Sequence, residues 1–351
     1  MRSPARLLTV ALAVAVPLGV AACSGGSTVA SGPHRVGFVI ANTNLNPAQE
    51  MADGFKAGVA MVPGVTSVVV GPDVIDGNKE ASMFRDLTGT AKSGISFFTL
   101  APELFASPLS DAAQKGIPLI AVDNPPPVAS PVTLFVGNDN VELGKMLADQ
   151  AIAHLPADAT GTVVLGTSAP GVPVLDKRAV GEKAELNAKL PGVTVIGPFD
   201  TKRDENANLQ SWRLLVRANP KALAFLGTGA ADAWNLAAVH RQTHGTWLGG
   251  GFDLDPRSLA GVKSGDLLLV SPEHYVKGAI AGELQASHAK TGAPLPKGWI
   301  YTPGMAITPA NVDAVIARQK SQAAKQAWFA PKVNAILTHL SDYLRPLNTV
   351  G

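Results

Sequence analysis

The segment "IPLIAVD", residues 117–123, decides the expected fold. It is a short apolar run without alternation of polar and apolar residues, and it ends at a carboxylate. Such a run is typical of a parallel strand that helices bury on both faces. Similar runs recur in the first half of the chain: "RVGFVIA" (35–41), "VTSVVVG" (65–71), "GISFFTL" (94–100) and "VTLFVGND" (132–139).

Helical patterns separate these runs. Pro47 stands at the start of a helix expected over 47–62, and Gly116 ends the helix expected within "SPLSDAAQKG" (107–116). The rhythm then repeats as "GTVVLGTS" (161–168), "GVTVIGPF" (192–199), "ALAFLGTG" (222–229), "TWLGGGFD" (246–253) and "DLLLVSP" (266–272). Two successive β-α-β series predict an α/β fold with two doubly wound parallel-sheet lobes.

The amino terminus has the layout of a secretory signal. Arg2 and Arg6 precede an almost wholly apolar stretch over 7–20, which is too short to span a bilayer comfortably as a permanent helix. Residues 20–23, "VAAC", resemble a bacterial lipobox, which implies cleavage before Cys23 and lipidation of its sulfur. We expect a signal peptide over 1–22, a lipidated flexible tether over 23–33, and an extracytoplasmic protein anchored to the cell membrane.

Composition limits the classes of partner. The chain has 351 residues, 46% hydrophobic and 16% charged, which suffices for two domains with proper cores. It carries 29 basic and 27 acidic residues, and loss of Arg2 and Arg6 with the signal leaves equal numbers. A neutral mature chain argues against nucleic acid as a partner. Because Cys23 is the only cysteine, no intramolecular disulfide can form.

Polar residues gather where the expected strands end. They are Asn42, Asn44, Asn46, Asp123, Asn124, Asn138, Asp139 and Asn140 in the first half, and Ser168, Lys177, Arg178, Thr228 and Asp253 in the second. Ligands of such sheets bind beyond the carboxyl ends of the strands, although any one of these residues could instead form a turn or cap a helix. Carboxylates, amides and a guanidinium without a nucleophile can bind a polyhydroxylated molecule.

Five stretches carry a resemblance to a known family. They are "FVGNDNVELGKMLADQAI" (135–152), "GIPLIAVDN" (116–124), "KRAVG" (177–181), "GGFD" (250–253) and "SPEHYVKGAIAGEL" (271–284). Over about residues 34–315 the chain resembles a sugar-binding lipoprotein of an ABC importer, of the ribose-binding and autoinducer-2-binding type. The resemblance implies a type I periplasmic binding protein, in which a hinge of three crossovers joins two lobes that close on a ligand.

The same resemblance implies lobe boundaries. Crossovers are expected near residues 138–139, 271–272 and 301–303. The first lobe would then comprise residues 34–138 and 272–301, and the second lobe residues 139–271 and 302–351. The segment 319–351 extends past the resemblance; its amphipathic pattern predicts a helix that packs on the second lobe.

Site residues follow from the resemblance position by position. Asn46, Asp123, Arg178 and Asp253 match ligand-binding positions of the family, and Asn138 stands where a polar hinge-side residue is usual. Gln49, Asn124 and Thr228 replace other residues of the family's pattern and complete the expected ligand-binding set. Two stacking aromatics of the family are missing; Trp234, Phe252 and Tyr275 could substitute for them or could belong to the cores.

Enzymatic alternatives find little support. "GTSAPG" (166–171) lacks the second glycine of a nucleophile elbow, and Asp232 stands where a dinucleotide fingerprint has its last glycine. His240 and His244 have i, i+4 spacing, but no glutamate follows the first, which indicates a solvated helix end and no metal site. We expect neither a cofactor nor a metal.

These features predict a monomeric binding protein that captures a small neutral sugar or polyol in an interlobe cleft and delivers it to an ABC permease and its ATPase. The alternative is a receptor of the same fold that presents its ligand to a sensor. Asp123, Arg178 and Asp253 together carry one negative charge, so sugar phosphates and sugar acids should be rejected. Alanine at Asp123 or Asp253 is expected to abolish binding while the fold survives.

Overall fold

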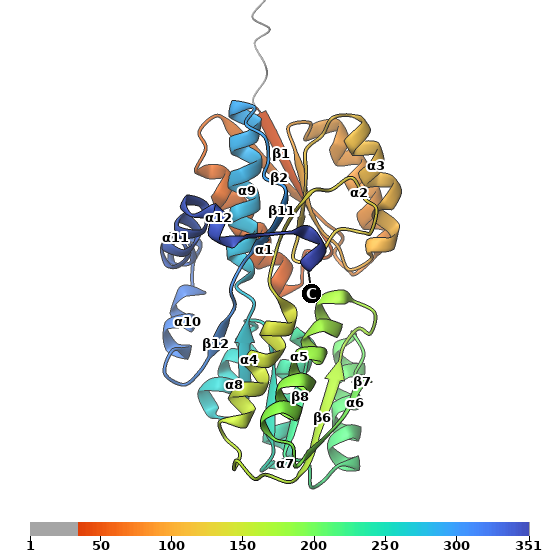
Figure 1. Cartoon of the computed structure of the whole chain (residues 1–351), viewed down its shortest axis with the longest axis vertical. Coiled ribbons are helices and arrows are strands. Elements are labelled where there is room, and N and C mark those ends of the chain that lie inside the picture. The colour runs from red at the N-terminus through yellow and green to blue at the C-terminus, as the bar shows by residue number, and fades with distance from the viewer. Residues whose placement is uncertain (1–33, 351) are drawn as a thin grey trace, which may run out of the picture. The chain divides into compact units, whose positions relative to one another are not determined.

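The computed structural model describes residues 34–350, which form two α/β lobes (Figure 1). The predicted signal peptide, Cys23 and the tether up to residue 33 lie outside the described residues. Within 34–350, no helix combines the length and apolar composition that a bilayer crossing needs. The predicted class of two lobes, each built on a mainly parallel sheet, is confirmed.

The first lobe is built on a seven-stranded sheet in the order β13-β11-β5-β4-β3-β1-β2. Its strands are β1 (His34–Ile40), β2 (Val65–Val70), β3 (Ile95–Phe98), β4 (Leu119–Val122), β5 (Leu134–Gly137), β11 (Gly298–Tyr301) and β13 (Leu344–Arg345). Neighbouring strands are parallel except for β13, which pairs antiparallel with β11 at the edge. The sequence runs predicted β1 to β5 and missed the last two strands.

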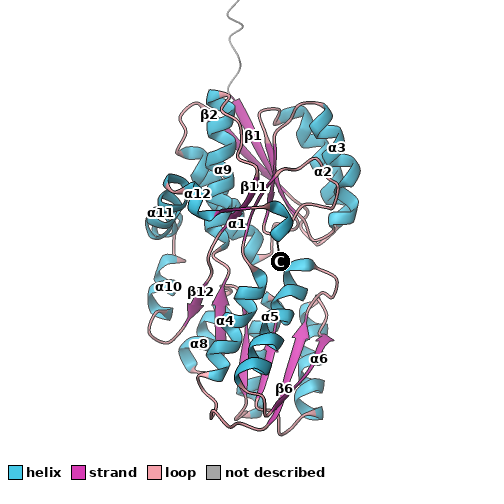
Figure 2. Ribbon diagram, viewed as in Figure 1, coloured by secondary structure: helices cyan, strands magenta, loops and turns pink. Residues whose placement is uncertain are grey.

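Helices cover both faces of this sheet (Figure 2). One face is covered by α1 (Asn46–Ala60), α9 (His274–Thr291) and α11 (Gln322–Thr338), with the short α12 (Leu340–Tyr343) after them. The other face is covered by α2 (Gly77–Thr90), the 3-10 turn Pro102–Phe105 and α3 (Ala106–Gln114). Phe38 and Phe55 pack together in the first core, and Phe84 and Phe105 in the second. Burial on both faces explains why the strands do not alternate in polarity.

The second lobe is built on a six-stranded sheet in the order β12-β10-β9-β8-β6-β7. Its strands are β6 (Gly161–Thr167), β7 (Val193–Asp200), β8 (Ala224–Gly227), β9 (Leu248–Phe252), β10 (Leu268–Ser271) and β12 (Met305–Ile307). The edge strand β12 is antiparallel to β10, so this sheet is also mixed.

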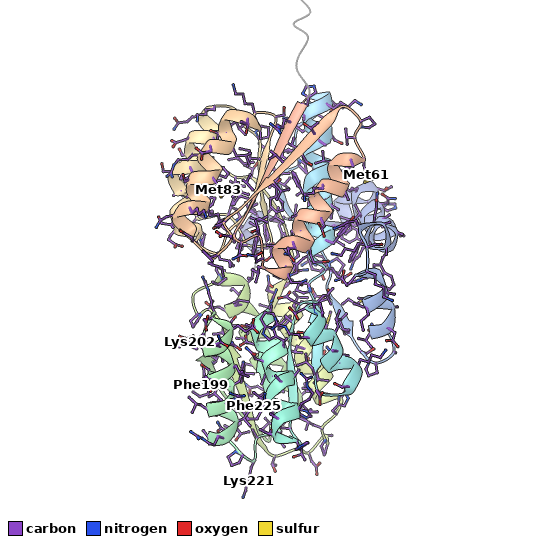
Figure 3. The ribbon with its side chains drawn as sticks, turned by 180° about the vertical axis from the view of Figure 1, so that it is seen from behind. Met61, Met83, Phe199, Lys202, Lys221 and Phe225 are labelled. Atoms are coloured by element: carbon purple, nitrogen blue, oxygen red, sulfur yellow. The ribbon has the colours of Figure 1, made fainter. Side chains whose placement is uncertain are left out.

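The helices of the second lobe also form two layers. One face is covered by α4 (Asn140–Ile152) and α5 (Pro173–Lys189), and the other by α6 (Glu205–Ala218), α7 (Ala230–Thr243), α8 (Pro256–Ser264) and α10 (Val312–Arg318). Phe225 lies on β8 inside this lobe (Figure 3) and packs edge-on against Trp212 and Trp247.

The carboxyl-terminal segment corrects one prediction. Residues 319–351 were expected on the second lobe, but Phe329, Val333 and Ile336 of α11 pack in the first core, and β13 extends the first sheet. The chain therefore passes between the lobes a fourth time, between α10 and α11, in addition to the passages that follow β5, β10 and β11 (Figure 1).

A buried ion cluster holds this fourth passage. Arg318 of α10 donates to Glu273 Oε1 at 2.7 Å, and Lys332 of α11 lies 3.6 Å from Glu273 Oε2. Glu273 directly precedes α9 and is 1% exposed, and Ser271 also donates to its carboxylate at 2.8 Å. Through Lys332, the carboxyl-terminal segment therefore contacts Glu273 in the passage between the lobes that follows β10.

Glu80 of α2 yields a pH prediction. It is 2% exposed, its Oε2 accepts a hydrogen bond from Thr99 at 3.1 Å, and its Oε1 is buried without a partner within 34–350. Burial raises the pKa of Glu80 to about 8, although the Thr99 hydrogen bond opposes the rise. Folded protein then keeps a proton that the unfolded chain releases near its ordinary pKa of 4.5.

The wild-type free energy of unfolding should therefore fall as pH rises from about 4.5 to 8, by roughly 1.4 kcal/mol per pH unit from this group. Glu80→Gln removes the carboxylate and should be more stable than wild type at pH 8 but not at pH 4.5. Urea unfolding at both pH values measures the difference. Glu103→Gln, at an exposed position of the same lobe, is the control and should not change the pH dependence. An equal effect of the two variants would contradict the prediction.

Candidate functional site

A cavity of about 120 Å³ is lined by residues of both lobes. Five charged or titratable side chains line it: Asp123, Arg178, Arg203, Asp253 and His274. The remaining lining is Ser168, Gly229 and a larger set of apolar residues: Leu45, Pro47, Ile75, Phe98, Leu100, Ala169, Val172, Val174, Leu175, Ala230, Ala231 and Trp234. The cavity thus contains three of the predicted site residues, one from the first lobe and two from the second.

Two strand ends position the carboxylates. Asp123 directly follows β4, and Asp253 directly follows β9. Their φ values are 68° and 76°, in the left-handed region that aspartate and asparagine tolerate better than most residues. This turn of the backbone ends each strand and leaves the carboxylate on the cavity wall.

A chain of buried polar groups connects the two carboxylates. Lys277 of α9 donates to Asp123 Oδ1, and its Nζ lies 3.1 Å from Nδ1 of His274. Since an ammonium group only donates, Nδ1 is the acceptor and Nε2 carries the hydrogen. Nε2 of His274 then donates to Asp253 Oδ1 at 2.8 Å. This last bond joins the first lobe to the second.

The charges of this group balance. Burial would raise the pKa of Asp123, but the adjacent charge of Lys277 outweighs burial and, with the charge of Arg178, holds the pKa below its ordinary value. Burial is likewise outweighed at Asp253, whose pKa is lowered chiefly by the hydrogen bond from His274. Two carboxylates, one guanidinium and one ammonium sum to zero. The single negative charge predicted from the sequence is the sum over Asp123, Arg178 and Asp253, and Lys277 balances it in the structure.

Arg178 is held from three sides. It lies in α5, and its Nε donates to Asn140 Oδ1 at 3.1 Å while its Nη1 donates to Thr228 O at 2.9 Å. Its guanidinium carbon stands 4.4 Å from the ring centre of Phe252. Within residues 34–350 the Nη2 group has no protein acceptor, so it can donate to a molecule in the cavity.

The other predicted site residues do not line the cavity. Asn138 donates to Pro272 O (3.1 Å) and Thr302 O (2.5 Å), so it ties together three passages between the lobes. The hydroxyl of Thr228 forms a hydrogen bond with the hydroxyl of Thr167, with the two oxygens 2.9 Å apart. The backbone carbonyl of Thr228 contributes to the site, because it accepts a hydrogen bond from Arg178.

Two of the three predicted amides of the first lobe donate to backbone carbonyls, and the third lines another hollow. Asn124 donates to Thr99 O at 2.8 Å, and the exposed Gln49 donates to Thr43 O at 2.9 Å. Asn46 lines a different hollow, although its neighbours Leu45 and Pro47 line the central cavity. Its Oδ1 is buried without a partner within 34–350.

The three aromatic residues have different positions. Trp234 lines the cavity, and the guanidinium of Arg257 covers its ring at 4.1 Å. Phe252 is fully buried beneath Arg178. Tyr275 stacks on Phe329 with ring centres 4.8 Å apart, in the first core. Only Trp234 is therefore placed to contact a ligand.

Sequence reasoning missed His274 and Lys277. Both lie in the first turn of α9, within the stretch 271–284, and their i, i+3 spacing places them on one side of the helix.

His240 and His244, the histidine pair noted in the sequence, do not converge on a metal site. His240 Nδ1 lies 2.9 Å from Asp266 Oδ1, and His244 follows α7 with a φ of 49°. In the described part of the chain, no group of three or more His, Cys, Asp or Glu side chains is placed to hold a metal.

Solved structures share the fold. A solute-binding protein of an ABC transporter from Agrobacterium vitis, bound with α-D-tagatopyranose, has a TM-score of 0.73 at 22% identity and covers 81% of this chain and 98% of its own. One from Burkholderia graminis, in complex with D-arabinose, has a TM-score of 0.72 at 23% identity (79% and 96%). A glucose-galactose binding protein from Geobacillus stearothermophilus has a TM-score of 0.70 at 20% identity (79% and 98%).

The family comparison covers most of the chain. A search of curated protein sequences found no match. The model of the periplasmic binding protein domain matches residues 36–293, which include most of both lobes and the residues Asp123, Arg178, Asp253 and His274. The chain therefore belongs to the periplasmic binding protein family, whose members bind and carry solutes and are not enzymes.

Proposed function

We propose that the protein is an extracytoplasmic solute-binding lipoprotein that captures a small neutral sugar or polyol and delivers it to an ABC permease. The observation that carries the proposal is the cavity where Asp123, Arg178 and Asp253 converge from two lobes. The family and the sugars named for the similarly folded structures support the same class of ligand.

The carboxylate and guanidinium atoms that make no hydrogen bond within the described residues can bind ligand hydroxyls. Asp123 and Asp253 each use Oδ1 within the protein, and their Oδ2 atoms have no protein donor within residues 34–350. Arg178 keeps its Nη2 donors. A hydroxyl both donates and accepts, so a vicinal pair can donate to the carboxylates and accept from the guanidinium. Hydrogen bonds to charged partners are the stronger kind.

Charge balance supports a neutral ligand. Asp123, Asp253, Arg178 and Lys277 already neutralise one another, so a bound phosphate or carboxylate would find no unpaired positive charge in this group. Arg203 also lines the cavity, where burial lowers its pKa and the charge of Glu103 opposes that change. The acidic neighbour reduces its attraction for an anionic ligand.

Ligand contacts with both lobes provide a basis for capture. A molecule that binds Asp123 in the first lobe and Arg178 in the second favours the arrangement in which both reach it. Its differential affinity then shifts the population toward that arrangement. A permease that recognises the ligand-bound arrangement would receive loaded protein in preference to empty protein.

The anchor belongs to the same proposal. Cleavage before Cys23 and lipidation of its thiol would keep the binding lobes at the membrane surface, near the permease. Mass spectrometry of the membrane-extracted protein tests this step. An unmodified Cys23 at the amino terminus would remove the anchor from the proposal.

A thermal-shift screen tests the ligand class. Pentoses, hexoses and acyclic polyols should include a compound that raises the melting temperature, because a ligand that binds only the folded state stabilises it. Matched sugar acids and sugar phosphates should have no such effect. A shift produced only by an acidic or phosphorylated sugar would overturn the neutral-ligand proposal. Loss of uptake of the identified ligand in a gene-deletion strain distinguishes delivery to a permease from presentation to a sensor.

A further inference from the structure

Most of the cavity wall outside the charged group is apolar. Ile75 and Leu100 contribute from the first lobe, and Val172, Leu175 and Trp234 contribute from the second. Ile75 precedes α2, Leu100 follows β3, and Val172 directly precedes α5. The apolar surface thus comes from both lobes, as does the charged group.

Part of this wall forms a hydrophobic cluster distinct from the four lobe cores. Ala169, Val172 and Val174 are its buried members, and Leu100 and Leu175 pack against them. Leu100 therefore reaches across from the first lobe to the second. The cluster lies at the ligand cavity itself, where its side chains can contact a bound molecule.

Few polar groups interrupt this wall. Its polar side chains are Ser168 and Arg203, and the backbone N–H of Gly229 already donates to Asp232 Oδ2 at 3.0 Å. A sugar hydroxyl buried against aliphatic side chains loses water and gains no partner. Each such hydroxyl should weaken binding by about 5- to 150-fold. A ligand with hydroxyls on every side suits only the charged part of the cavity.

We infer that the preferred ligand is a small neutral polyhydroxylated group that carries an alkyl, acyl or aryl substituent. This inference rests on the proposed function, because it assigns the hydroxylated part to Asp123, Arg178 and Asp253. The substituent lies against Leu100, Val172 and Trp234. Each methylene buried there should increase affinity about fourfold.

Calorimetric titration of the protein with matched glycosides tests the inference. The probes are glucose, galactose and arabinose, each as the free sugar and as its methyl, butyl and phenyl glycosides. For at least one sugar, the butyl or phenyl glycoside should bind at least tenfold more tightly than the methyl glycoside. All of these compounds are neutral, so charge does not distinguish them.

A matched pair of variants locates the effect. Val172 directly precedes α5 and lines the cavity, so Val172→Thr replaces one methyl group of the wall with a hydroxyl of similar size. It should weaken binding of the butyl or phenyl glycoside about tenfold, and weaken binding of the free sugar by a clearly smaller factor. Val180→Thr, on the exposed side of the same helix, should change neither affinity.

The outcomes separate two failures. If a free sugar binds as tightly as its butyl and phenyl glycosides, or if Val172→Thr behaves as Val180→Thr does, the apolar-substituent inference is wrong and the proposed function stands. If no sugar or glycoside binds at all, both are overturned.

Discussion

Replacing Lys277 with methionine is expected to lower the free energy of unfolding by about 3–5 kcal/mol. Lys277 is fully buried in α9 and donates to Asp123, which is 4% exposed. Methionine fits the space of the lysine stem but leaves the Asp123 carboxylate without its closest positive partner. An unpaired buried charge is far more costly than the loss of a surface ion pair.

Two further variants make this prediction specific. Asp123→Asn combined with Lys277→Met removes both charges and should recover most of the lost stability, since asparagine tolerates the φ of 68°. Lys189→Met breaks a pair with Asp149 in which both side chains are about half exposed, and its effect should be much smaller. Urea unfolding measures all three. Equal effects of Lys277→Met and Lys189→Met would contradict the assignment of a buried pair.

The same reasoning revises an expectation drawn from the sequence. Asp123→Ala was expected to abolish binding with the fold intact. The structure places fully buried Lys277 against Asp123, so this change should cost stability as well as binding. The double variant Asp123→Asn with Lys277→Met should lose binding but recover most of the stability, so it separates the effect on binding from the effect on stability.

Replacing Gly181 with alanine is the second large effect expected. A Cβ at Gly181 of α5 would lie 2.0 Å from Val141 O of α4, and a Cβ at Gly144 of α4 would lie 2.0 Å from Arg178 O. The two helices thus meet backbone to backbone. A carbonyl in a helix cannot rotate away, so α5 must shift from α4, at a cost of about 1–3 kcal/mol or more.

The shift should reach the site as well. Arg178 lies less than one turn before Gly181 in α5, and its Nε donates to Asn140 at the start of α4. We expect ligand affinity to fall together with stability in Gly181→Ala. Gly89→Ala is the control, because that glycine is exposed in α2 and a Cβ there would have no neighbour within 4 Å; it should be neutral or slightly stabilising. Similar urea midpoints for the two variants would contradict the close helix contact.

The sequence predicted most of the fold because its strongest signals are local. Runs such as residues 117–122 and 248–252 are apolar throughout, and that pattern is typical of buried parallel strands. The short edge strands β12 and β13 have three and two residues and offer no such run. The amphipathic pattern of α11 indicated that it packs, but an apolar stripe does not specify which lobe it covers.

The candidate site could be predicted only in part. Asp123 and Asp253 were identifiable because each directly follows a strand that the pattern revealed. Lys277 was not, since it stands 154 residues after its partner and a helical lysine is ordinarily a surface residue. The apolar wall was missed for a similar reason. Leu100 and Val172 meet only when the two lobes come together.

The most direct test of the central claim is a calorimetric titration of wild type and Asp253→Asn with the tightest neutral ligand from the thermal-shift screen. Asparagine tolerates the φ of 76° and can still accept from His274, so the fold should persist. The account predicts that affinity falls about 10- to 150-fold, because a charged acceptor of ligand hydroxyls is lost. Wild-type affinity in this variant would show that the ligand does not bind at Asp253 and would contradict the assignment of the cavity as the binding site.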